Sequence, residues 1–193
     1  MGVNWPALSI AIVDPAGHFA IMQKSILRGA GVTKFSVADG LAMLTKDLII
    51  GRDVVLLNWT RADDGFAEII AGVRAKDTSP DPFAPIVMIA ALSHKSRVKT
   101  ALDAGANSFI AAPFRASDIC RHVARAVAAP ATFVDAPGYF GPERRRKADP
   151  LFEGEERRVR EAKLLTGAEL QAERTRMRTT ALSALEIKVS LGA

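Results

Sequence analysis

Five short apolar runs divide the first two-thirds of the sequence at regular intervals. They lie at residues 8–13, 34–38, 54–58, 85–90 and 108–112. Amphipathic helical patterns separate and follow them, at 16–29, 40–50, 64–75, 95–104 and 117–128. Three of the runs are apolar throughout rather than alternating, which is typical of strands that are covered on both faces. This order predicts an α/β fold in which a parallel sheet, with right-handed crossovers, lies between two layers of helices.

The composition changes after residue 129, where we place the end of this domain. Residues 130–154 hold four prolines and several glycines, which predicts a linker without regular structure. Tyr139 and Phe140 are the residues most able to anchor this linker onto the domain. Residues 155–193 have a helix-rich pattern, with a break expected near Gly167.

One apolar stripe runs along this C-terminal extension. It consists of Leu170, Met177, Ala181, Leu185 and Val189. Such a stripe indicates packing, either on the chain's own domain or against a second copy in a homodimer.

Composition narrows the class of protein. The sequence has 193 residues, a net charge of +5 and one cysteine, Cys120, which fits a reducing cytoplasm. No apolar stretch approaches the roughly 18 residues that a membrane span needs. His18, His94 and His122 are scattered rather than grouped, so we expect no metal site and no cofactor.

Ligand sites in open parallel sheets lie at the carboxyl ends of the strands. The predicted strands place Asp14, Asn58, Ala90 and Ala112 around one such edge. Asn58 is followed six and seven residues later by Asp64-Gly65, a turn signal.

Ordered motifs at these positions resemble a known family. They are IVD at 12–14, LLNWTRADDG at 56–65, PIVMIAA at 85–91 and ALDAGANSFIAAPF at 101–114. Together they resemble the response-regulator receiver domain, the CheY-like module of two-component phosphorelay signalling. The resemblance covers about residues 7–129 and implies a doubly wound (βα)5 sheet with strand order 2-1-3-4-5. It also implies a cis bond between Ala112 and Pro113.

The sequence departs from the family at the residues that carry its chemistry. The phosphoacceptor aspartate is replaced by Asn58, and an amide is a very poor nucleophile. The second acidic position after the first strand is Pro15, the hydroxyl position is Ala90, and the lysine position is Ala112. We therefore expect a degenerate pseudo-receiver without enzymatic activity, in which Asn58 makes neutral hydrogen bonds and Asp14 caps the first helix.

The family signals through its fourth helix, fifth strand and fifth helix. The corresponding surface here is predicted to carry Lys95, Arg97, Lys99, Phe109, Arg115, Arg121 and Arg125. Phe109 is expected to be fixed core rather than a switch. The basic side chains form either an ordinary solvated face or a docking face for an acidic partner, such as a signalling protein or a histidine kinase.

An arginine-rich repeat of the form G-x-E-R-R begins at Gly141 and again at Gly154. Its candidate anion-binding residues are Arg144, Arg145, Arg146, Arg157, Arg158 and Arg160. Arginine pairs suit phosphate groups, so a cyclic dinucleotide is one candidate ligand, beside a solvated or protein-docking segment. Nucleic-acid binding is less favoured because acidic residues are interspersed.

We therefore expect a cytoplasmic, non-catalytic signalling adaptor that works without phosphorylation, through protein–protein interaction of its receiver surface and its C-terminal tail. The alternative is a cyclic di-GMP effector that binds its ligand through the arginine-rich segment.

Overall fold

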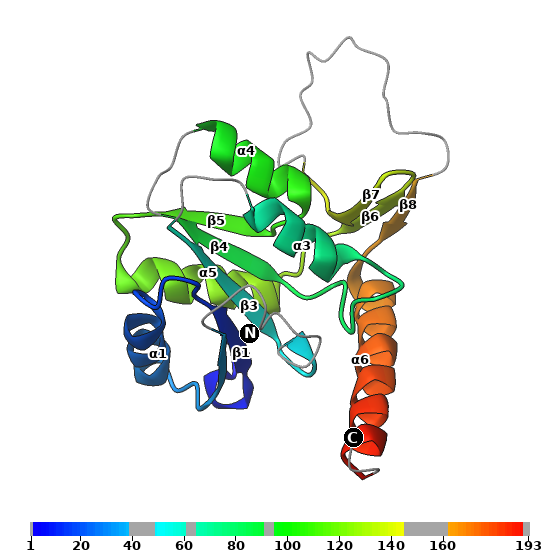
Figure 1. Ribbon diagram of the computed structural model, residues 1–193, viewed down its shortest axis with the longest axis horizontal. Coiled ribbons are helices and arrows are strands. Elements are labelled where there is room, and N and C mark those ends of the chain that lie inside the picture. The colour runs from blue at the N-terminus through cyan, green and yellow to red at the C-terminus, as the bar shows by residue number, and fades with distance from the viewer. Residues whose placement is uncertain (1, 39–48, 61–64, 91–94, 145–161, 191–193) are drawn as a thin grey trace.

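A five-stranded parallel sheet forms the centre of the structure (Figure 1). The computed structural model describes residues 2–38, 49–60, 65–90, 95–144 and 162–190. Within the last range, residues 187–190 are described by their backbone alone. The strands are β1 Ser9–Val13, β2 Lys34–Ala38, β3 Val54–Trp59, β4 Ile86–Ala90 and β5 Ser108–Ala111. Their spatial order is β2-β1-β3-β4-β5, as the family resemblance implied. β1, β3 and β4 are buried along their whole length, which explains their continuous apolar sequences.

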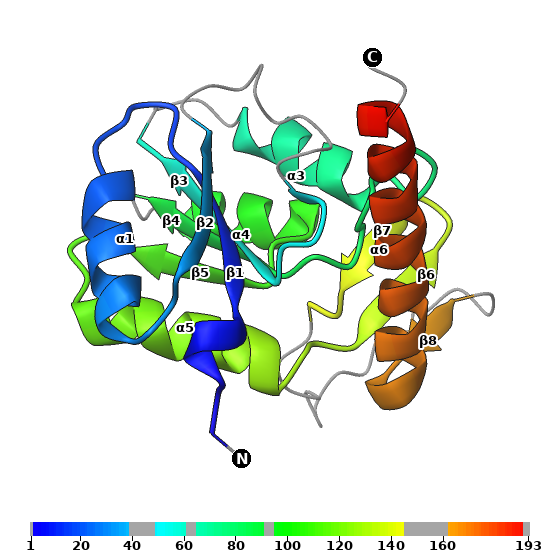
Figure 2. The same ribbon diagram turned by 90° about the horizontal axis from the view of Figure 1, so that it is seen from below.

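Helices cover both faces of this sheet (Figure 2). They are α1 Ala20–Gly29, α3 Phe66–Arg74, α4 Lys95–Ala104 and α5 Ala116–Ala128. On one face, Leu27 of α1 and Val123 of α5 pack in one core cluster with β1, β3, β4 and β5. On the other, Phe66 of α3 and Ala101 of α4 pack in a second cluster. The predicted three-layer α/β fold is confirmed.

Three of the predicted helices differ at their ends from the observed ones, and α3, predicted at 64–75, spans Phe66–Arg74. The helix predicted from residue 16 begins at Ala20, because the chain first turns at residues 15–18. At α5 the cap residue is Arg115, and Asp118 accepts a hydrogen bond from the Arg115 backbone amide at 2.8 Å. The helix predicted at 40–50 lies outside the described residues, apart from residues 49 and 50.

The prediction of an irregular linker at 130–154 is wrong for its first part. β6 Phe133–Ala136 and β7 Tyr139–Pro142 form an antiparallel hairpin, and Gly138 takes a positive φ of 77° in its turn. Pro137-Gly138 favours a tight turn, and the apolar residues on either side of it supply the two strands. Residues 145–154 lie outside the described residues.

The C-terminal extension adds a third strand and a long helix. β8 Lys163–Leu165 pairs with β6, which gives a small antiparallel sheet of order β7-β6-β8. α6 Gly167–Ser190 follows directly and begins at the glycine where a break was expected. The part of the predicted helical region before residue 162 lies outside the described residues.

This small sheet and α6 pack against the amino end of the central sheet (Figures 1 and 2). Phe83, just before β4, lies among Phe133, Leu165 and Leu170, with Phe140 and Met177 at the edge of the cluster. Its ring centroid is 5.2 Å from those of both Phe133 and Phe140. The stripe of α6 therefore begins by packing on its own domain, one of the two interpretations that its pattern left open.

Candidate functional site

The pocket positions that the family resemblance implies lie at the carboxyl edge of the central sheet. Asp14 follows β1, Asn58 lies near the end of β3, Ala90 ends β4 and Ala112 follows β5. Asn58 is opposite Ile89 in the parallel register of β3 and β4. The structure thus brings together the four positions that the sequence placed at one edge.

Asn58 is fully buried and pairs with a second amide that the sequence analysis missed. Gln23, on the inner face of α1, donates from Nε2 to Asn58 Oδ1 at 2.5 Å. In return, Asn58 Nδ2 donates to Gln23 Oε1 and to the carbonyl oxygen of Val13, both at 3.1 Å. Both amide groups of Asn58 are therefore satisfied by neutral partners, and its side chain joins β3 to β1 and α1.

Asp14 serves the start of α1. Its Oδ2 accepts hydrogen bonds from the backbone amides of Phe19 at 2.7 Å and Ala20 at 2.8 Å. The carboxylate is buried, and its Oδ1 has no hydrogen-bond partner in the structure. These hydrogen bonds show the expected capping role of Asp14 at the start of α1. Asp14 itself lies outside the first turn of the helix.

A magnesium ion, which the family implies, does not fit these residues. Magnesium is usually held by one or two carboxylates in a nearly octahedral shell, and here Asp14 is the only carboxylate among the described pocket residues. Pro15 has no ligand atom in its side chain, and the amide NH2 of Asn58 is committed as a donor. Across the part of the chain that the structure describes, no three His, Cys, Asp or Glu residues are grouped to hold a metal ion.

The positions that assist phosphoryl transfer in the family carry methyl groups here. Ala90 is buried at the end of β4, and Ala112 precedes Pro113 through a cis peptide bond, as expected. Neither side chain can stabilise developing negative charge. The loops at 61–64 and 91–94 lie outside the described residues.

Only some of the residues predicted for the partner face are exposed. Lys95, Lys99, Arg115, Arg121 and Arg125 are exposed, but the placement of Arg97 on the outer face is wrong. Arg97 is 8% exposed and faces inward on α4, four residues from the buried Ala101. Phe109 is half-buried and packs against the core, and its role as a fixed residue stays a prediction.

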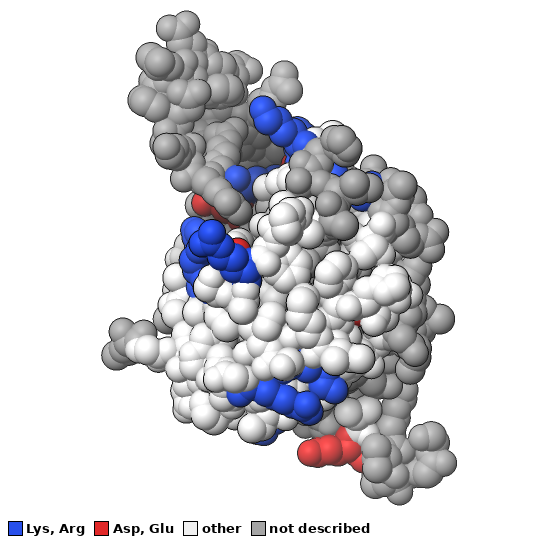
Figure 3. Space-filling view, turned by 90° about the vertical axis from the view of Figure 1, so that its left-hand side faces the viewer, with Lys and Arg blue, Asp and Glu red and all other residues white. Residues whose placement is uncertain are grey.

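Two of the basic side chains on this face form ion pairs with neighbouring aspartates. Lys99 pairs with Asp103 at 2.5 Å along α4, and Arg121 pairs with Asp118 at 2.6 Å along α5. The hydrogen bond from Lys99 is the main cause that lowers the pKa of the Asp103 carboxyl, with Arg144 adding to it. Figure 3 views the side that holds α1 and the carboxyl end of β5. Most of the described surface there belongs to residues other than Lys, Arg, Asp and Glu, and the lysines and arginines gather at separate places on it.

One arginine of the anion-binding set can be placed. Arg144 forms an ion pair with Asp103 at 2.9 Å, and its guanidinium carbon lies 3.7 Å from the centroid of the Tyr139 ring. It therefore fastens the end of the hairpin to α4. The other five candidates, Arg145, Arg146, Arg157, Arg158 and Arg160, lie outside the described residues.

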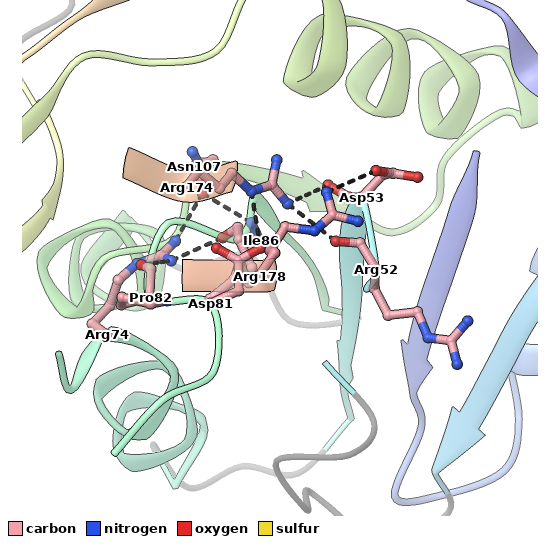
Figure 4. Close-up of polar contacts among 10 residues, drawn as sticks. Arg52, Asp53, Arg74, Asp81, Pro82, Ile86, Asn107, Arg174 and Arg178 are labelled. Carbon is pink, nitrogen blue, oxygen red and sulfur yellow. Dashed lines mark hydrogen bonds and ion pairs between the residues drawn. The ribbon is translucent and has the colours of Figure 1, made fainter. Parts of the chain in front are cut away.

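A second polar cluster lies at the amino edge of the sheet, and the sequence analysis did not predict it. Arg174 of α6 donates from Nε to Asp81 Oδ2 at 2.9 Å, and from Nη2 to the carbonyl oxygens of Arg52 and Asp53 (Figure 4). One turn further along α6, Arg178 pairs with Asp53 at 3.1 Å. Burial raises the pKa of the Asp81 carboxyl, although the nearby arginines oppose this shift.

Arg74, at the end of α3, is the buried centre of this region. Its guanidinium donates to the carbonyl oxygens of Gly105, Pro82 and Ala84, and to Asn107 Oδ1. Burial lowers its pKa to about 10, and its guanidinium carbon is 5.2 Å from the centroid of the Phe133 ring. Arg74 thus joins α3, the segment before β4 and the α4–β5 turn to the hairpin of the extension.

Comparison with known proteins supports a CheY-like response-regulator receiver domain in the first two-thirds of the chain. The chain is 29% identical over 120 residues to the chemotaxis protein CheY of Listeria monocytogenes, covering 62% of this chain and 98% of the relative. It is 29% identical over 114 residues to the DNA-binding response regulator MtrA of Mycobacterium tuberculosis, covering 59% of this chain and 48% of MtrA.

Solved structures agree on the fold. Chemotaxis protein CheY4 of Vibrio cholerae gives a TM-score of 0.53 at 20% identity, covering 62% of this chain and 98% of CheY4. No protein-family model matches the chain. These relatives support a signalling role of the two-component type. Among the described residues, no helix has both the length and the apolar character to cross a membrane.

Proposed function

We propose that this chain is a non-catalytic signalling adaptor that acts without phosphorylation, by binding another protein through its receiver surface. The observation that carries the proposal is the amide pair between Asn58 and Gln23 at the phosphoacceptor position. An amide cannot accept a phosphoryl group as the family's aspartate does. Because Gln23 satisfies both groups of that amide, the pocket serves packing instead of chemistry.

The remaining basic surface supports a protein partner. Lys95 and Arg115 are exposed, and neither forms an ion pair between described residues. They belong to the surface that the family uses for signalling, and a partner with acidic groups would associate faster at low salt than at high salt. A histidine kinase or another signalling protein is therefore the class of partner that we propose.

A binding experiment with the full chain tests this proposal. Partner capture from nuclease-treated source cells is compared for the wild type and for the double variant Lys95→Glu, Arg115→Glu. The matched control is Arg28→Glu, Lys34→Glu, which makes the same charge change at two exposed positions on α1 and β2. Loss of the partner in the first variant alone supports the proposal, and equal capture by all three proteins counts against this face.

The lack of phosphorylation is tested separately. Incubation of the wild type with acetyl phosphate and magnesium should leave the intact mass unchanged. A stable, magnesium-dependent phosphorylated species would contradict the proposal.

The alternative function is that of a cyclic di-GMP effector. Its one describable residue, Arg144, is engaged with Asp103 and Tyr139. Calorimetric titration of the wild type and of the triple alanine variant at residues 144–146 distinguishes the two functions, because heat of binding that is lost in the variant would favour the dinucleotide.

A further inference from the structure

A pocket of about 260 Å³ lies where the last turns of α5 meet the start of β5 and the chain that enters and leaves the hairpin. It is separate from the pocket positions that the family resemblance implies, which are at the other edge of the sheet. The receiver part contributes Asn107, Ser108, His122 and Arg125, and the extension contributes Ala131, Thr132 and Glu143. The pocket therefore exists only when the extension is docked.

Hydrogen-bond donors converge on this pocket. Asn107 Oδ1 already accepts from Arg74 Nη2 at 2.9 Å and from the Ile86 backbone amide at 2.8 Å. Because its carbonyl oxygen is fixed in this way, its NH2 group is left to donate elsewhere. Within the described residues, the hydroxyls of Ser108 and Thr132 form no side-chain hydrogen bond, and the Arg125 guanidinium forms no ion pair.

The wall also holds the carboxylate of Glu143 and the imidazole of His122, and both residues interact with other groups of the chain. An oxyanion is a ligand that would accept hydrogen bonds from several of the remaining donors at once.

We propose that this pocket binds a small metabolite through a phosphate or carboxylate group. Arg125 supplies the charge and a bidentate pair of donors, while Asn107, Ser108 and Thr132 fix the orientation of the oxyanion. The volume is below the roughly 300 Å³ at which drug-sized sites begin, so the ligand is compact. Because Thr132 follows α5 and leads into β6, such a ligand would bridge the receiver domain and the extension.

Nuclear magnetic resonance of the full chain tests this assignment with two probes, inorganic phosphate and malonate, titrated at constant ionic strength with chloride. Saturable shifts are expected at the backbone amides of Ser108, Ala131 and Thr132. A response to phosphate alone identifies a phosphate-bearing ligand, and a response to malonate alone identifies a carboxylate.

Two arginines of the same helix provide the decisive comparison. Arg125→Ala should weaken binding of the responding probe about tenfold or more, because a charge-assisted hydrogen bond is lost. Arg121→Ala is the matched control, since Arg121 is exposed, pairs with Asp118 and does not line the pocket. Thr132→Val should weaken binding by a smaller factor. Shifts that do not saturate, shifts spread over other basic surfaces, or equal binding by both arginine variants would overturn the proposal.

Discussion

The guanidinium of Arg174 lies against a fully buried carboxylate, that of Asp81, although the two residues are 93 positions apart in the sequence. Arg174 keeps 12% of its side-chain surface exposed and Asp81 none. Of the other nearby cations, Arg178 pairs with Asp53. All the guanidinium nitrogens of Arg74 donate to Gly105, Pro82, Ala84 and Asn107. Arg174 is therefore the ion-pair partner on which Asp81 depends.

Removal of this partner should destabilise the protein strongly. Arg174→Met leaves Asp81 buried without its ion pair, which typically costs about 3–5 kcal/mol of unfolding free energy. Arg176→Met is the control, because Arg176 pairs with Glu173 on the exposed side of the same helix, where water screens such pairs and they contribute little to stability. Urea denaturation measures both, and similar losses in the two variants would contradict the role given to Arg174.

Restoring the family's aspartate should not restore its chemistry. Asn58→Asp removes the donor to Val13 and Gln23 and places a buried carboxylate oxygen against their two carbonyl oxygens, so the unfolding free energy should fall by about 1–3 kcal/mol. Acetyl phosphate with magnesium should still leave the mass unchanged, because Pro15, Ala90 and Ala112 remain. A receiver with an intact aspartate site serves as the positive control, and phosphorylation of the Asn58→Asp protein would refute the expectation.

Asp103 offers a test that depends on pH. Its pKa lies below the ordinary 3.8, first because of the hydrogen bond from Lys99 and then because of Arg144. Since the folded value is the lower one, the stabilisation that Asp103 provides is present above its ordinary pKa and is lost as the pH falls through the lowered value. Carboxyl resonances titrated by nuclear magnetic resonance should show a higher Asp103 pKa in Lys99→Ala, and a smaller rise in Arg144→Ala. An unchanged pKa in Arg144→Ala would mean that the hairpin is not fastened to α4 in solution.

The extension should be part of the folding unit. Phe133→Ala leaves a cavity beside Phe83 and removes the ring above Arg74, with an expected loss of about 3–5 kcal/mol. Leu164→Ala is the control in the same small sheet, because Leu164 is 43% exposed and such changes usually stay within about 0.5 kcal/mol.

Truncation makes the same point at a larger scale. A chain that ends at Ala129 exposes Phe83 and leaves Asp81 without its ion-pair partner, Arg174. It should therefore be much less stable than a chain that ends at Glu186. A cooperative, equally stable unfolding transition in the shorter chain would restore the boundary at residue 129 that the sequence suggested.

The central sheet could be predicted from sequence because its signal is local. Apolar runs mark β1, β3 and β4, and the motifs around Asn58 and Pro113 fix which strand ends meet. Gln23 was missed because its role depends on a contact 35 residues away, yet it carries a signal. It is a polar residue on the buried side of α1, between Ala20 and Leu27.

The extension was misread for a related reason. Prolines and glycines were interpreted as a linker without regular structure, whereas Pro137-Gly138 makes a tight turn between two strands whose Phe133 and Phe140 pack against Phe83. The apolar stripe of α6 was recognised, but its pattern does not show that Arg174 and Arg178 lie in the interface with the receiver part. The ion pair between Arg174 and Asp81 leaves no local pattern in the sequence, because the two side chains come together only in the folded chain.

The long reach of α6 also has a consequence for the order of folding during synthesis. Arg178 pairs with Asp53 across 125 residues, so the amino edge of the sheet is completed only after α6 has left the ribosome. Contacts of such sequence separation are slow to form. Until then the nascent receiver carries an unpaired Asp81 and an uncovered Phe83, and this interval is when we expect chaperones to engage the protein.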